Sequence, residues 1–124
     1  MDISSLYTTE AHNAGSEMRV KGPDGKETDF YIMVAGVDSD VWRDDIKQRQ
    51  RKALAAAMSG EAAEEVDDSA ERLAAATIGW KGLEAEGVAV DFTMDRAADL
   101  YRNAPYLLDQ VNRYIGDRAN FMQG

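Results

Sequence analysis

The chain has 124 residues, a length typical of a single domain, and 44% of them are hydrophobic, as in ordinary globular proteins. It contains no cysteine, which excludes disulfides, thiolate nucleophiles and cysteine-ligated zinc. Its 23 acidic and 14 basic residues give a formal net charge of −9. A field of that sign repels phosphate backbones and anionic lipids, so neither nucleic acid nor a membrane is expected as a partner.

Residues 1–37 are expected to form an N-terminal arm and a β-hairpin. Residues 1–16 show no regular hydrophobic period, and the first ten lack the basic and apolar segments of a leader. No stretch approaches the roughly 20 apolar residues that span a bilayer, so a cytosolic protein is expected. Apolar and charged residues alternate over 17–21, Gly-Pro-Asp-Gly at 22–25 favours a turn, and 28–37 is rich in β-forming residues.

Residues 38–124 are expected to be mainly helical, and the first helix is the best marked. Asp38, Ser39 and Asp40 can accept hydrogen bonds from the unpaired N–H groups of a helix start, and Gly60 is a natural stop. Basic residues mostly occupy the faces that the apolar residues leave. The apolar residues recur at spacings of three and four, namely Trp42, Ile46, Ala53, Leu54, Ala57 and Met58.

Three more helices are expected after a solvated acidic linker at 61–68. The second has an apolar stripe of Leu73, Ala74, Thr77 and Ile78; the glycines of 79–83 then interrupt it, and 87–92 is an extended connector. Thr93 caps the third helix, and the fourth begins near Pro105 and continues to Met122. The predicted fold class is therefore α+β, one domain with a hairpin packed on about four helices.

Residues suited to catalysis are scarce in this sequence. A Ser, His and Asp triad needs a histidine, and the single one, His12, lies among Ala, Asn and Gly residues that promise no rigid platform. The acids between Asp38 and Asp45 resemble a calcium loop, but Trp42 and Arg43 occupy positions that need a ligand and a glycine. The sequence thus predicts neither an enzyme nor a metal or cofactor site.

Charge is distributed unevenly along the chain. Five of the fourteen cations lie between Arg43 and Lys52, whereas 61–71 is acidic. The basic run is either a solvated helix face, a phosphate contact, or a surface that meets the acidic segment of the same chain or of a neighbouring copy. The last interpretation predicts a homo-oligomer. Its candidate self-association residues are Arg43, Lys47, Arg51, Glu64, Glu65 and Asp68.

Three segments, in this order, resemble the tail assembly chaperones of long-tailed bacteriophages. The first is Val-Ala-Gly-Val-Asp-Ser-Asp-Val-Trp-Arg at 34–43, which is similar to the family's entry into a basic helix. The second is Ala-Thr-Ile-Gly-Trp-Lys-Gly-Leu at 76–83, and the third is Asp-Arg-Ala-Asn-Phe at 117–121. With the hairpin that leads into the first segment, the resemblance spans nearly the whole chain.

The resemblance implies a non-catalytic protein of the infected bacterial cytoplasm, absent from the mature virion. Such a protein forms multimers around the phage tape-measure protein, keeps it soluble and recruits tail-tube protein, often through a longer frameshifted form. The hypothesised partner contacts are Trp80, Leu83 and Phe121, although the core is the commoner place for large aromatic residues such as Trp80 and Phe121. Two alternatives are a structural virion protein of the head-tail or tail-terminator type and an acidic DNA mimic.

Overall fold

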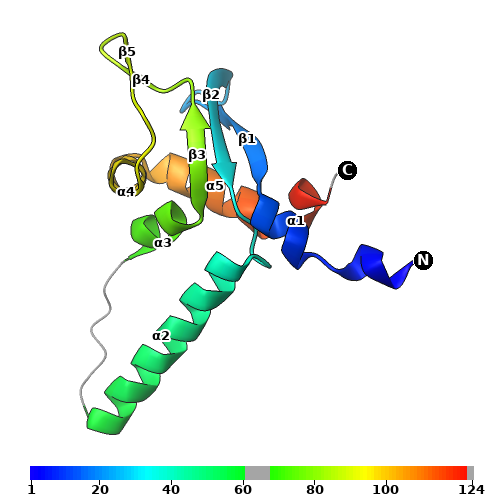
Figure 1. Ribbon diagram of the computed structural model, residues 1–124. Coiled ribbons are helices and arrows are strands. Elements are labelled where there is room, and N and C mark those ends of the chain that lie inside the picture. The colour runs from blue at the N-terminus through cyan, green and yellow to red at the C-terminus, as the bar shows by residue number, and fades with distance from the viewer. Residues whose placement is uncertain (61–67, 123–124) are drawn as a thin grey trace.

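The computed structural model describes residues 1–60 and 68–122 and shows an α+β fold. A three-stranded antiparallel sheet of order β1-β2-β3 has helices packed on one face (Figure 1). The elements are η1 (Ile3–Leu6), α1 (Thr9–Ala14), β1 (Ser16–Lys21), β2 (Glu27–Val34), α2 (Asp40–Ser59), α3 (Ser69–Ala75), β3 (Thr77–Lys81), β4 (Glu84–Ala85), β5 (Val88–Ala89), α4 (Met94–Asn103), α5 (Pro105–Gly116) and η2 (Arg118–Phe121).

The predicted hairpin is confirmed as β1 and β2. Its register places Met18 opposite Ile32, and the turn closes through a 2.9 Å hydrogen bond from the Gly25 N–H to the Gly22 carbonyl. Gly25 has a φ of +80°, which glycine adopts without steric cost. Side chains alternate along both strands, so one face of the hairpin is buried and the other meets solvent.

The prediction that Thr77 and Ile78 end the second helix is wrong, because α3 stops at Ala75 and both residues belong to β3. This strand pairs with β2 and places Trp80 opposite Ile32. β-Branched residues favour strands, but Thr77 and Ile78 alone do not distinguish the alternating pattern of a strand from the three-to-four spacing of a helix. Gly82, with a φ of +86°, ends the strand where a Cβ atom would lie 2.0 Å from the Asp29 carbonyl oxygen.

The core lies between the sheet and three helices. On the sheet side it contains alternate residues of β1 and β2, and α3, α4 and α5 cover them. Tyr101 is fully buried at its centre, where the hydroxyl bonds the Thr77 Oγ1 at 2.8 Å. The main core side chains are Met18, Val20, Phe30, Ile32, Val34, Leu73, Ala74, Ala97, Tyr101, Leu107, Val111 and Ile115.

The last two helices follow the prediction in part. Thr93 caps α4 as expected, its Oγ1 accepting a 3.1 Å hydrogen bond from the Arg96 N–H. The last helix ends at Gly116 and not at Met122, because Asp117 starts a separate 3₁₀ turn by accepting from the Ala119 N–H. The short hairpin of β4 and β5 occupies part of the segment expected to be a simple connector.

Three segments project from the body in Figure 1: the N-terminal segment (residues 1–7), the β4–β5 hairpin and the helix α2. α2 is by far the largest of them. Its 20 residues span about 30 Å at the usual helical rise. The bounds expected for this helix are confirmed, since Ser39 caps its start and Gly60, with a φ of +72°, ends it. No residue of α2 is fully buried, and Trp42, at its first turn, packs partly against the core.

Candidate partner-binding helix

The start of α2 is fixed to α1 by hydrogen bonds. The Asn13 side chain accepts from the Asp40 N–H at 2.7 Å and donates to the Asp40 carboxylate at 2.9 Å. Ser39, itself buried, accepts from the Trp42 N–H as the helix cap. The helix therefore leaves the body in a defined direction.

His12 is fully buried next to this junction, contrary to the expectation that its surroundings give no rigid platform. It lies in α1, and its ring stacks on Phe121 with 4.7 Å between centroids. Burial lowers the pKa of the imidazole, the Asp38 carboxylate opposes this effect, and the Arg118 guanidinium adds to it. The local sequence gave no signal for this placement, because His12 contacts Phe121 through a fold that joins the two ends of the chain.

Asp38 connects three segments beside His12. Its carboxylate accepts hydrogen bonds from Arg118 at 2.8 and 3.1 Å and from the Thr8 hydroxyl at 2.6 Å. These donors, the Arg118 guanidinium first, lower the pKa of Asp38 to about 2. The sequence suggested capping for this residue, and the structure shows that it instead ties the start of α1 and η2 to the turn before α2.

One face of α2 leans on α3 through an ion-pair network. Asp45 lies 2.9 Å from Arg49 and 3.0 Å from Arg72, and Arg49 also pairs with Asp68 at 2.5 Å. The Arg72 guanidinium stacks over the Trp42 ring at 5.6 Å. Trp42, Asp45 and Arg49 follow a spacing of three and four, so they share one side of the helix.

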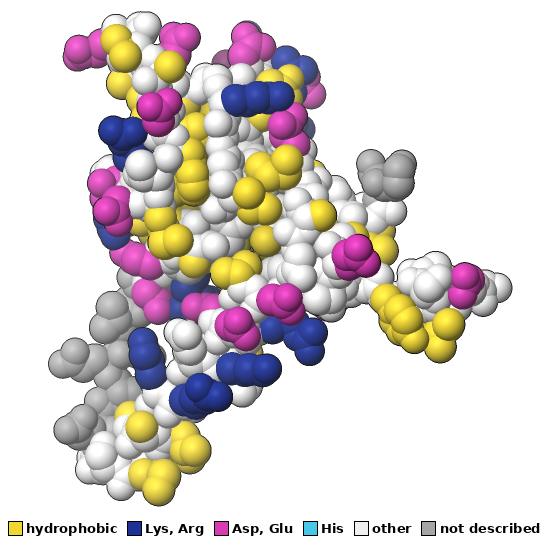
Figure 2. Space-filling view, viewed as in Figure 1, with side chains coloured by type: hydrophobic (Ala, Val, Ile, Leu, Met, Phe, Trp, Pro, Cys, Tyr) yellow, Lys and Arg dark blue, Asp and Glu magenta, His cyan; other side chains and the backbone are white. Residues whose placement is uncertain are grey.

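The opposite face of α2 is exposed along its whole length. Arg43, Lys47 and Arg51 are spaced by four residues, and Leu54 and Met58 continue the same line. The fractional exposures of Leu54 and Met58 are 62% and 81%. Figure 2 shows this division, with dark blue cations along the shaft of the helix and yellow apolar side chains at its far end.

The charge of α2 is opposite to that of the rest of the chain. The helix holds five cations and three acids, whereas the remaining residues hold nine cations and twenty acids. A basic and apolar helix projecting from an acidic body presents complementary potentials to a second copy or to another acidic partner. The arrangement suits binding to such a partner.

The residues expected to contact a partner lie at or near the core in this structure. Phe121 is 6% exposed and packs between His12 and Tyr114. Trp80 is half-buried, its ring Nε1 donates to the Val90 carbonyl at 2.8 Å, and Leu83 packs partly against the core. The exposed apolar residues of α2, which the sequence had grouped as a helix face, are better placed to meet a partner.

The residues expected to drive self-association fall into three groups. Arg43, Lys47 and Arg51 share the exposed face of α2. Asp68 pairs with Arg49 of its own chain, an interaction that lowers the pKa of the Asp68 carboxyl. Glu64 and Glu65 lie outside the described residues. The observed contact of Asp68 supports the within-chain alternative for this one acid.

No family model, curated protein or solved structure matches this chain. In residues 1–60 and 68–122, no cluster of three His, Asp or Glu side chains has the arrangement to hold a metal ion. No helix in the same ranges is both long and apolar enough to cross a membrane. The shape, charge and exposure of α2 are therefore the features that point to a function.

Proposed function

We propose that this protein is a tail assembly chaperone of a long-tailed phage, which binds the tape-measure protein and keeps it soluble. The observation that carries the proposal is the exposed end of α2. This helix of 20 residues has no buried side chain and ends in the exposed residues Leu54 and Met58. Exposed apolar side chains lower solubility unless a partner covers them. Such a helix can lie along a helical client whose apolar stripes need cover.

The composition of α2 suits this task. Met58 is unbranched and polarisable, so it adapts to varied apolar surfaces. The acidic remainder of the chain keeps a loaded complex soluble through its net charge. In this proposal the complex forms in the host cytoplasm, multimers surround the client, tail-tube subunits are recruited later, and the finished virion lacks the protein.

The client contact is assigned here to Leu54 and Met58 in place of Trp80, Leu83 and Phe121. Trp80 and Phe121 already have aromatic neighbours within the chain, and moving them to a partner would open the core. The DNA-mimic alternative gains no support from the surface. Eight of the described carboxylates pair with cations of the same chain, so they form no uninterrupted acidic face.

Co-expression with the long protein encoded immediately downstream tests the proposal. The wild-type chain should move that protein from the pellet to the soluble fraction. The double variant Leu54→Gln/Met58→Gln keeps helix propensity and charge, and it should lose this effect. Val88→Gln, which replaces an equally exposed apolar residue on β5, is the matched control and should retain it.

Two outcomes count against parts of the proposal separately. If the downstream protein is equally insoluble with and without the wild-type chain, the chaperone function is wrong. If the wild type solubilises it and the double variant does so equally well, the function stands and the assignment to the end of α2 is wrong.

A further inference from the structure

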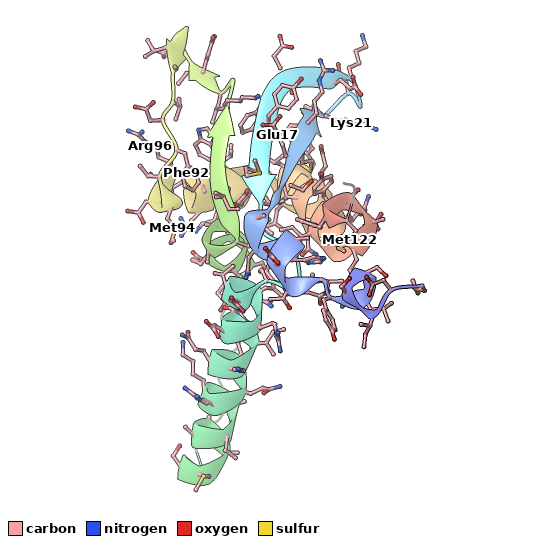
Figure 3. All side chains as sticks on the ribbon, turned by 45° about the vertical axis from the view of Figure 1, so that its right-hand side comes forward. Glu17, Lys21, Phe92, Met94, Arg96 and Met122 are labelled. Atoms are coloured by element: carbon pink, nitrogen blue, oxygen red, sulfur yellow. The ribbon has the colours of Figure 1, made fainter. Side chains whose placement is uncertain are left out.

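An open groove of about 710 Å³ runs between β1 and α5, away from α2. Figure 3 shows β1, marked by the labels of Glu17 and Lys21, beside this helix. One wall comes from β1 and the turn that follows it, and the other comes from α5. Its lining includes Arg19, Lys21, Pro23, Tyr106, Arg113 and Tyr114.

β1 is an edge strand, and side chains of α5 occupy part of its open edge. The Lys21 N–H donates to the Gln110 amide oxygen at 2.8 Å, and the Gln110 amide nitrogen donates to the Lys21 carbonyl at 3.0 Å. This is the pair of bonds that a residue of a neighbouring antiparallel strand makes. The Tyr114 hydroxyl similarly donates to the Glu17 carbonyl at 3.3 Å. Gln110 and Tyr114 thus stand where a fourth strand would lie.

Arg19 lies between Glu17 and Lys21, the two residues of β1 whose backbone groups are bonded by side chains of α5. Backbone groups alternate in direction along a strand, so the N–H and carbonyl of Arg19 point to the same edge as those of Glu17 and Lys21. Unpaired groups at a sheet edge are a template for pairing with another chain. The groove therefore has the hydrogen-bonding pattern of a site for an extended polypeptide.

The N-terminal segment, residues 1–7, is an exposed apolar segment that the same molecule supplies. The fractional exposures of Ile3, Leu6 and Tyr7 are 60–67%, and η1 contains no buried residue. The hydrogen bonds within residues 2–7 are local, so the 3₁₀ turn opens without breaking a core contact. Figures 1 and 3 show the segment pointing away from the body.

We propose that the N-terminal segment of one copy pairs with the β1 edge of a second copy, in the groove beside α5. Residues 3–7 match residues 17–21 in number. Incoming backbone groups replace the Gln110 and Tyr114 bonds one for one and add bonds to Arg19. Ile3 and Tyr7, on one face of the extended segment, are covered by the groove side chains.

The charges agree with this occupant. Lys21 and Arg113 of the groove form no ion pair with any residue in 1–60 or 68–122. The lining also holds Asp109 and Asp117, so the groove carries both signs of charge, and Lys21 and Arg113 are the cations that can attract Asp2, the charged side chain of the segment. Because each copy gives a segment and receives one, the contact either closes as a reciprocal dimer or continues head-to-tail into rings or filaments. This contact is independent of any client.

Cysteine cross-linking of the purified protein tests the proposal, because the natural chain has no thiol. Ser5 and Arg19 are the centres of the two paired stretches, so they are neighbours whichever way the segment runs. A mixture of Ser5→Cys and Arg19→Cys proteins should give a disulfide-linked dimer of the two variants under mild oxidation. The control mixture of Ser5→Cys and Lys81→Cys places the second thiol on β3, at the other edge of the sheet, and should not.

Two further variants separate pairing from a merely structural role. Gln110→Ala removes a competitor for the edge and should tighten self-association on the order of two- to tenfold by sedimentation. Ile3→Ser/Tyr7→Ser changes no buried residue and should weaken it by a similar factor. Equal cross-linking in both mixtures, or unchanged association in either variant, overturns the proposal. Cross-linking of Arg19→Cys to the co-expressed downstream protein alone would assign the groove to the client and likewise overturn it.

Discussion

The ring Nδ1 of His12 accepts a 3.0 Å hydrogen bond from the backbone N–H of Asp38, two residues before α2 begins. A ring nitrogen that accepts must be unprotonated, so the neutral imidazole is the form that fits. The other nitrogen, Nε2, is buried and lies 3.8 Å from the Asp38 carboxylate, beyond hydrogen-bond range. The direction of the projecting helix is thus coupled to one titratable ring.

The first prediction concerns the pH dependence of stability. Because the folded pKa of His12 lies below its ordinary value of about 6.5, the unfolded chain takes up the proton first as the pH falls. Stability from this group is complete above pH 6.5 and decreases as the pH falls below it. Each unit between the two pKa values corresponds to about 1.4 kcal/mol.

Urea unfolding at pH 7, 6 and 5 measures this slope, and NMR titration of the imidazole gives the folded pKa directly, since the chain has one histidine. In His12→Gln the slope over this interval should flatten, because Gln does not take up a proton there. A folded pKa at or above 6.5 would contradict the interpretation.

The second prediction uses Gly36, which packs against the same ring. A Cβ atom there would lie 2.0 Å from the His12 Nδ1, in a site that cannot widen without moving α1. Gly36→Ala should therefore cost about 1–3 kcal/mol of unfolding free energy, as overpacking does. Gly79→Ala, where a Cβ atom would meet nothing within 4 Å, is the control and should change stability little. Equal effects of the two substitutions would rule out the steric argument.

The elements that the sequence predicted correctly carry strong local signals. The hairpin has alternation and a Gly-Pro turn, and α2 has Ser39 at one end and Gly60 at the other. β3 was missed because Thr77 and Ile78 fit a helical stripe as well as a strand, and pairing with β2 decides between them. Short segments of this kind obtain their structure from distant partners.

The candidate site, like the fold, could be predicted only in part from local patterns. The spacing of Leu54 and Met58 predicted one helix face, but periodicity does not reveal whether a face is covered by the same chain or by another. Trp80 and Phe121 are large enough to serve either a partner or the core, and both pack on aromatic neighbours distant in sequence. Burial depends on where the remaining elements lie, and this information is absent from the local pattern.

The third prediction concerns the buried hydroxyl pair in the core. Burial raises the pKa of Tyr101 to about 12, while its bond to Thr77 opposes this effect. Thr77 Oγ1 also donates to the Leu73 carbonyl at 2.8 Å, so the Tyr101 hydroxyl must be the donor in their shared bond. Tyr101→Phe should cost about 1 kcal/mol and Thr77→Val more, because the latter leaves the buried Tyr101 hydroxyl unpaired and also removes one of the two hydrogen bonds to the Leu73 carbonyl.

Chemical denaturation of both single variants and the double variant tests this pairing. The double variant should cost less than the two single costs added together, since the shared bond is counted twice in that total. Strict additivity would mean that the two hydroxyls do not interact.

The fourth prediction contrasts two leucines. Leu73 is 2% exposed in the core and Leu54 is 62% exposed on α2. Leu73→Ala should destabilise the chain by about 2–5 kcal/mol through the cavity it leaves, whereas Leu54→Ala should change stability by less than about 0.5 kcal/mol. The two variants should be compared by thermal unfolding at a protein concentration low enough for the chain to be monomeric. A large loss for Leu54→Ala there would show that the end of α2 packs within its own chain.

The last prediction concerns the cations on the exposed face of α2. If Arg43, Lys47 and Arg51 meet the acidic surface of a second copy, raising the salt concentration from about 0.05 to 0.5 M should weaken self-association, because exposed charges are screened. Replacing all three with Gln should reduce both the association and its salt dependence, and Lys26→Gln/Lys81→Gln/Arg96→Gln serves as a charge-matched control away from the helix and from the groove beside α5. Light scattering across the salt series gives the mass of the particle. A mass that is constant over the series, and equal in the wild type and the α2 variant, would show that these cations do not hold copies together.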